Sequence, residues 1–122
     1  MAENPIRLPH NHGSRGGEIV RSMPSAGEIE KISEVLRHLG DPSRLRIFWL
    51  LCHCEECVMN IAALTEMSSS AVSHHLRLLK DSGLIVSRRA GKEMYYRAAD
   101  TEMVASLHHT FEEVARISCP GK

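Results

Sequence analysis

The sequence predicts a mainly α-helical protein with one small β-hairpin, in the order α-α-α-α-β-β-α. Apolar residues recur at three- and four-residue spacing in five segments, which is the spacing of one helix face. Two short β-type runs are separated by a turn that contains glycine, as in a hairpin. The chain has 122 residues, enough for one domain but marginal for a stable monomer once its ends are subtracted. We therefore expect a dimer.

The N-terminal part predicts a flexible arm followed by a helix. Residues 1–27 include three prolines and four glycines and lack a sustained hydrophobic period. We expect the folded domain to cover residues 28–117 and a short tail to cover 118–122. Its first helix ends at Gly40 and has an apolar face formed by Ile29, Ile32, Val35, Leu36 and Leu39.

Two further helices follow. Asp41-Pro42 is a helix-start signal, and the apolar face of this second helix is Leu45, Phe48, Leu51 and Cys52. Asn60 is expected to cap a short third helix that runs to about Met67 and buries Ile61 and Leu64.

The fourth helix is predicted over residues 69–81, after a serine run that supplies the turn and the cap. Its apolar stripe is Val72, Leu76 and Leu79, and Gly83 ends it. Residues 84–89 and 93–97 are expected to pair as a hairpin around a turn at 90–92. Asp100 is then expected to cap a last helix whose apolar face is Met103, Val104, Leu107, Phe111 and Val114.

This layout is typical of a winged helix-turn-helix that binds DNA. The net charge is zero, but residues 68–97 carry six Lys/Arg against two acids. The expected contacts to phosphates and base edges are Ser69, Ser70, Ser73, His74, His75, Arg77 and Lys80 of the helix and Arg88, Arg89 and Lys92 of the hairpin. There are two alternatives to DNA binding. The helix and the hairpin could be ordinary solvated surface, or the winged fold could bind only proteins.

Two stretches of sequence resemble the ArsR/SmtB family of bacterial metal-responsive repressors. AVSHHLRLLKDSGLIVSRRAGKEMYYR is similar to its recognition helix and wing, and LGDPSRLRIFWLL to its preceding helix. The resemblance runs from about Glu28 to Phe111. It implies a repressor that is a homodimer, paired through its first and last helices, on an imperfectly palindromic double-stranded operator with half-sites ~34 Å apart.

The cysteines predict the class of effector. No segment is apolar enough for export or membrane insertion, so we expect a cytoplasmic protein whose thiols are reduced. The run Cys-His-Cys-Glu-Glu-Cys, residues 52–57, favours a thiophilic ion such as Zn(II), Cd(II), Pb(II) or As(III). Cys54 and Cys57 would share one ion if they lay on a helix, whereas Cys52 also fits as a small core residue.

The resemblance adds further expectations about metal ligands. Members with a site at Cys57 complete it from the arm of the other subunit, where this chain offers His10 and His12, and Cys52 and Cys119 are secondary candidates. Met59 and Asn60 replace residues that serve as ligands in the family's arsenic, cadmium and zinc sensors. The family's second zinc site is expected to be lost, because its positions hold Asp100, Glu102, Glu113 and Arg116, and His108 and His109 are expected to be polar interface residues.

Two other chemistries fit the cysteines. A pair of thiols forming a disulfide or polysulfide under oxidant or sulfide stress would make a redox-responsive repressor. A zinc enzyme with Glu55 or Glu56 as its base is the other alternative. The cysteines adjoin a helix-turn-helix and no substrate pocket is indicated, so we expect a protein that is not an enzyme.

Overall fold

A computed structural model describes residues 6–116, which divide into one unit up to Ser33 and a second from Glu34. The first unit contains the short helix α1 (Gly16–Ile19), the 3-10 turn η1 (Val20–Ser22) and the start of α2 (Ala26–Leu39). These two short elements lie in the expected arm and bury no residue.

Helix α2 begins with a reciprocal capping pair, two residues before the expected start. The backbone N–H of Glu28 donates to Ser25 Oγ at 3.2 Å, and the N–H of Ser25 donates to Glu28 Oε1 at 2.9 Å. Ser-x-x-Glu is a sequence signature of a helix start, because each side chain satisfies a backbone donor that the helix leaves without a partner. These hydrogen bonds lower the pKa of Glu28 below its ordinary value.

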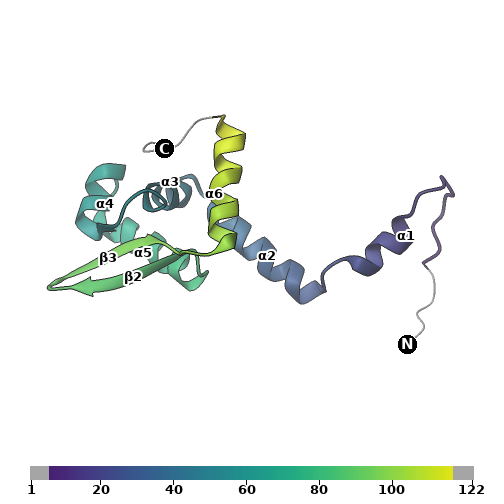
Figure 1. Ribbon diagram of the computed structural model, residues 1–122, viewed down its shortest axis with the longest axis horizontal. Coiled ribbons are helices and arrows are strands. Elements are labelled where there is room, and N and C mark those ends of the chain that lie inside the picture. Colours follow the sequence, from purple (N-terminus) through teal and green to yellow (C-terminus); the bar gives the residue numbers. More distant parts are fainter. Residues whose placement is uncertain (1–5, 117–122) are drawn as a thin grey trace. The chain divides into compact units, whose positions relative to one another are not determined.

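The described part of the second unit contains the end of α2, four further helices and one three-stranded antiparallel sheet. Figure 1 labels the four helices and the strands of the hairpin. The helices are α3 (Pro42–Leu51), α4 (Val58–Thr65), α5 (Ser69–Asp81) and α6 (Glu102–Ala115). The strands are β1 (Glu56–Cys57), β2 (Ile85–Ala90) and β3 (Glu93–Ala98), in the order β1-β3-β2. The mainly helical fold with a small hairpin is confirmed, with α1, η1 and β1 added to the expected elements.

Two of the expected helix caps are present. Asp41 Oδ2 accepts the backbone N–H of Arg44 at 3.0 Å, with Pro42 as the first residue of α3. Ser68 Oγ accepts the N–H of Ala71 at 3.1 Å at the start of α5. Both side chains satisfy a donor that the first turn of a helix cannot satisfy internally.

Two other expected caps are wrong. Asn60 lies inside α4, where its side-chain amide donates to Glu56 Oε1 at 2.8 Å, and α4 begins after Cys57 with no side-chain cap. The last helix is capped by Thr101, whose Oγ1 accepts the N–H of Val104 at 3.2 Å. Threonine offers the same capping chemistry as the aspartate before it, so sequence alone does not separate the two positions.

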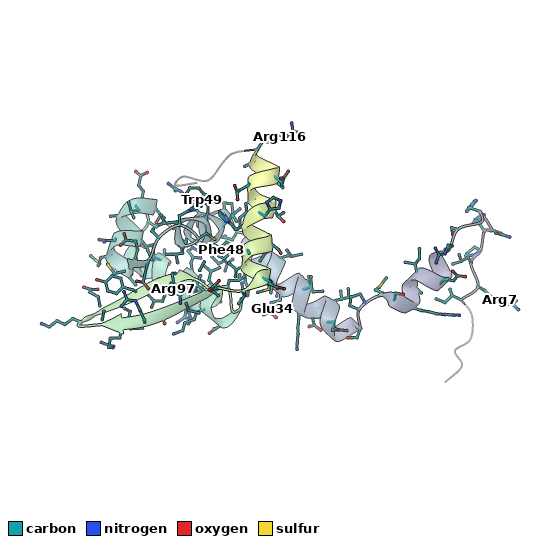
Figure 2. All side chains as sticks on the ribbon, viewed as in Figure 1. Arg7, Glu34, Phe48, Trp49, Arg97 and Arg116 are labelled. Atoms are coloured by element: carbon teal, nitrogen blue, oxygen red, sulfur yellow. The ribbon has the colours of Figure 1, made fainter. Side chains whose placement is uncertain are left out.

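The core of the second unit surrounds Phe48 of α3 (Figure 2). Phe48 is fully buried, and its ring meets Phe111 of α6 edge to face at a centroid distance of 5.8 Å. The other fully buried large side chains come from α3, α4, α5, the residue before β2 and the first residue of β2: Ile47, Leu51, Ile61, Val72, Leu76, Leu79, Leu84 and Ile85. Leu64, expected in the core, is 56% exposed.

The hairpin of β2 and β3 turns through two residues, Gly91 and Lys92, since Ala90 and Glu93 are already paired. Gly91 has a φ of +63°, which side-chain-bearing residues seldom adopt and which two-residue hairpin turns favour. On its other side, β3 pairs with the two residues of β1, with Glu56 opposite Tyr96 and Cys57 opposite Tyr95.

Candidate nucleic-acid interface and cysteine loop

Helices α4 and α5 are joined by a tight turn of three residues. Glu66 has left-handed backbone angles, with φ 55° and ψ 43°, and Ser68 then caps α5. The backbone N–H of Met67 donates to the carbonyl of Ala62 at 3.0 Å, which closes the end of α4. The two helices therefore form a helix-turn-helix, and Val72, Leu76 and Leu79 of α5 are buried beneath its exposed face.

The exposed face of α5 collects most of the expected DNA contacts. Its exposed side chains are Ser69, Ser70, Ser73, His74, Arg77 and Lys80. Arg77 Nη2 lies 3.3 Å from His74 Nδ1, so the guanidinium donates to the imidazole within this face. Short hydroxyls near the helix start and cations further along suit a helix that enters a DNA groove between phosphates.

His75 does not share this exposed face. Its Nδ1 is enclosed and has no hydrogen-bond partner among residues 6–116. Burial lowers the pKa of His75, against the raising effect of the Asp41 carboxylate at the start of α3. The expectation that His75 contacts DNA therefore remains a prediction without geometric support.

The three expected contacts of the hairpin, Arg88, Arg89 and Lys92, are all exposed. Arg88 and Arg89 are consecutive in β2 and therefore point to opposite faces of the strand. Arg88 donates two hydrogen bonds to the carboxylate of Glu55, at 2.9 and 2.6 Å, and its guanidinium lies 5.1 Å from the ring centre of Tyr95. These hydrogen bonds lower the pKa of Glu55 and raise that of Arg88.

Residues 52–57, which we call the cysteine loop, connect α3 to α4. Cys52 packs against the core, Cys54 is half-buried, and Cys57 is buried at 9% exposure in β1. All three are free thiols. Cys54 Sγ donates to the carbonyl of Leu50 at 3.5 Å, and burial, followed by the charge of Glu56, raises the pKa of its thiol.

The loop does not place its cysteines as a helix would, so the helical i, i+3 geometry considered for Cys54 and Cys57 is not the one observed. Within residues 6–116, no group of three or more His, Cys, Asp or Glu side chains is arranged to hold a metal ion. In the first unit, the rings of His10 and His12 stack with centroids 5.6 Å apart. Cys119 lies outside the described residues.

The sequence does not single out two relationships that involve the cysteine loop. Glu55 fixes Arg88 of the hairpin, and His53 Nε2 lies 3.0 Å from His108 Nε2 of α6. Neither pair has a local signature, because their members are 33 and 55 residues apart in the chain. The two acids of the run at 52–57 and the excess of cations in the hairpin give only a weak hint of the first pair.

Comparison with known proteins supports the helix-turn-helix assignment. Residues 41–87 match the model of a family described as bacterial regulatory protein, arsR family. The chain is 35% identical to a transcriptional repressor SmtB homolog of Synechocystis sp. over 107 residues, which cover 88% of this chain and 78% of that protein. It is 36% identical over 121 residues to a cadmium resistance transcriptional regulatory protein CadC homolog of Staphylococcus aureus, covering 96% and 99% of the two chains.

Solved structures agree with this result. A homodimeric winged helix-turn-helix DNA-binding domain from Mycobacterium bovis superposes with a TM-score of 0.67 at 36% identity, covering 75% of this chain and 83% of that one. NolR of Sinorhizobium fredii gives a TM-score of 0.71 at 26% identity and covers 79% of this chain and 99% of its own. None of the helices between residues 6 and 116 is long and apolar enough to cross a membrane.

Proposed function

Because the chain belongs to the ArsR family of bacterial regulatory proteins, we propose that it is a homodimeric transcriptional repressor whose operator binding is relieved by a thiophilic metal ion. The observation that carries this proposal is the exposed polar face of α5, the second helix of the helix-turn-helix, which the basic hairpin follows directly in the chain. Its relatives are transcription regulators, so the prediction that the chain is not an enzyme is confirmed.

Apolar surface on the first and last helices of the domain supports pairing with a second copy. On α2, Ile29, Ile32 and Leu36 are 42%, 49% and 53% exposed, and on α6 Val114 is 80% exposed. A groove of about 590 Å³ runs between α3 and α6, and its lining includes Leu45, Trp49, Phe111 and Val114. Exposed apolar surface of this kind marks an interface, and a second copy would bring two α5 helices to successive major grooves.

The cysteine loop supports an effector site because it joins both DNA-facing elements. Its last residue, Cys57, immediately precedes α4, and β1 pairs with β3 of the hairpin. An ion at Cys54 and Cys57 would therefore act on the helix-turn-helix and the hairpin together. A coupling of ~1–3 kcal/mol, typical of allostery, would change DNA affinity by roughly 5 to 150-fold.

Metal sensing is favoured over thiol oxidation. The raised pKa of Cys54 reduces the thiolate fraction on which disulfide exchange depends. A metal ion can bind Cys54 despite this small thiolate fraction, because coordination of the sulfur displaces the thiol proton. His10 and His12 of the arm, with Cys52 and Cys119, are the candidate further ligands, and Zn, Cd, Pb and As(III) are the candidate ions.

Fluorescence anisotropy on promoter DNA tests both parts. If Arg77 contacts a base, Arg77→Ala should weaken binding by about 1–3 kcal/mol. If it contacts a phosphate, the variant should lower the slope of log affinity against log salt concentration by about one. Arg21→Ala removes the same charge from the arm and should change neither quantity. Equal binding by the Arg77 variant and the unmodified protein would contradict the DNA interface.

The effector is tested on the reduced, metal-free protein with Cd(II) as a thiophilic probe. Affinity for DNA should fall on addition of Cd(II), and Cys54→Ser and Cys57→Ser should abolish that response. Tight DNA binding that ignores Cd(II) but falls after oxidation would replace the metal with a redox signal.

A further inference from the structure

Two histidines from distant parts of the chain meet between the cysteine loop and α6. His53 lies in the cysteine loop, two residues after the end of α3, and His108 lies in the middle of α6. Their Nε2 atoms are 3.0 Å apart, and the rings are inclined at 72° with centroids separated by 4.7 Å. The two imidazoles therefore meet in a T-shaped arrangement with their Nε2 atoms in contact.

This point adjoins a cavity with potential metal ligands on its wall. The cavity has a volume of about 450 Å³, and its lining includes Cys52, Cys54 and Asp100 as well as the two histidines. His108 keeps 17% of its side chain exposed, so a small ion can reach it from solvent. Cys54 is also half-buried, in the same loop as His53.

Each imidazole also contacts a residue close to it in the chain. The ring of Trp49 packs against His53 at a centroid distance of 4.5 Å. Glu112 Oε1 lies 3.9 Å from His108 Nδ1, one helical turn away in α6. A carboxylate on that side favours the tautomer with its proton on Nδ1, which leaves Nε2 of His108 to accept a hydrogen bond from His53.

The separation of the Nε2 atoms suits a shared metal ion. Two nitrogens bound at about 2.0–2.1 Å to a tetrahedral ion lie roughly 3.3 Å apart. The observed 3.0 Å is also a hydrogen-bond distance, so one Nε2 proton bridges the pair in the absence of metal. A cation in place of that proton requires the rings to separate only slightly.

We propose that His53, His108 and Cys54 bind a borderline divalent ion of the Zn²⁺ and Co²⁺ class, with water as the remaining ligand. The proposal deepens the proposed metal response by assigning ligands within one protomer. Cys54 must turn from the Leu50 carbonyl to reach the ion, which is consistent with the lack of a ready three-residue site within residues 6–116. On binding, the bridging proton of His53 moves from Nε2 to Nδ1 and the thiol proton of Cys54 leaves to solvent, so two nitrogen lone pairs and one thiolate form the three bonds.

Cobalt binding to the reduced full chain tests this assignment by absorption spectroscopy. The unmodified protein should show the visible bands of tetrahedral Co²⁺ and a near-ultraviolet thiolate-to-cobalt band. His108→Ala should lower the Co²⁺ affinity at least about tenfold, since even partners outside the ligand set cost 10–100-fold. His109→Ala is the matched control, because His109 is the neighbouring exposed histidine and faces Glu113 at 3.5 Å. Unchanged affinity and spectrum in His108→Ala would overturn the site.

A second measurement needs no variant and therefore does not depend on correct folding of one. Imidazole ¹⁵N chemical shifts of the unmodified protein should change on Zn²⁺ addition at Nε2 of His53 and His108 and stay constant for His109. Shifts confined to other histidines would overturn the proposal. Cys54→Ser should retain nitrogen ligation and lose the thiolate band, and retention of that band would remove Cys54 from the ligand set.

DNA anisotropy separates this proposal from the proposed function. Cobalt bound by His53 and His108 without any change in operator affinity would support the site and refute the metal response. Loss of the Cd(II) response in the cysteine variants, with normal cobalt behaviour in His108→Ala, would support the metal response and refute this site.

Discussion

The carboxylate of Glu55 accepts both hydrogen bonds of the Arg88 guanidinium, from Nε at 2.9 Å and from Nη2 at 2.6 Å. Arg88 is one of the expected DNA contacts of the hairpin, and Glu55 lies between Cys54 and Cys57 in the cysteine loop. The same cation therefore has two competing anionic partners, the Glu55 carboxylate and a DNA phosphate.

This competition predicts that Glu55→Gln binds DNA more tightly in the metal-free state. The amide keeps the size of the side chain but loses the charge that holds Arg88, so the guanidinium becomes available to phosphate. The gain should be less than about tenfold, because exposed ion pairs are weak. Anisotropy measures it, with Glu93→Gln, which removes one negative charge from the hairpin itself, as the control. A Glu55→Gln protein that binds no better than this control would contradict the competition.

Asp41 predicts a pH-dependent contribution to stability. Its hydrogen bond from the backbone of Arg44 lowers its pKa below the ordinary 3.8, so the folded state favours the ionised carboxylate. The stabilisation is therefore complete above the ordinary pKa and is lost as the pH falls through the lower, folded-state value. Asp41→Ala should reduce the free energy of unfolding by about 1 kcal/mol at neutral pH. Asp41→Asn retains the cap and should reduce the acid dependence, which urea unfolding at several pH values will show.

Gly83 and Gly27 predict opposite responses to alanine. Gly83 follows α5 with a φ of +77°, and its surroundings leave space for a Cβ, so Gly83→Ala should destabilise the fold by about 1–2 kcal/mol through backbone strain alone. Gly27 lies in α2 with equally open surroundings, and alanine there should stabilise the helix by roughly 0.5–1 kcal/mol. Thermal unfolding compares the stability of the two variants. A loss of stability in both would show that the positive φ of Gly83 is not what destabilises Gly83→Ala.

The exposure of Val114 leads us to expect that the dimer depends on α6. Val114→Glu places a charge on a side chain that is 80% exposed beside the apolar groove of α3 and α6, so it should shift the dimer toward monomer. Analytical ultracentrifugation measures the shift, and operator affinity should fall with it. Leu64→Glu, on the exposed side of α4, is the control for a new charge at an apolar surface position and should leave the dimer intact. Equal sedimentation of both variants would remove this face from the interface.

The sequence predicts best those elements whose signals are local. Asp41-Pro42 and Ser68 start their helices through hydrogen bonds that span three residues, and the stripe of α5 repeats at helical spacing. Strand β1 was not predictable in this way, because two residues carry no alternation and exist as a strand only through pairing with β3. The burial of His75 and the meeting of His53 with His108 likewise depend on packing between helices that periodicity does not describe.

The exposed polar face of α5 was accordingly predictable from helical spacing, whereas the arrangement of the candidate effector site was only partly so. Three thiols in six residues are visible in the sequence, but the loop that carries them turns Cys57 into the sheet and Cys54 toward the end of α3. Those directions are set by the termination of α3 and the pairing of β1, which are properties of the folded domain.

The brevity of β1 has a kinetic consequence. Its second residue, Cys57, pairs with the hairpin and is also the residue before α4, so this short junction links the helix-turn-helix to the hairpin. A displacement at that junction would reach both DNA contacts of a protomer at once. Dissociation from an operator half-site would then be a single exponential event, without a long-lived species in which the hairpin has left the DNA while α5 remains in the groove.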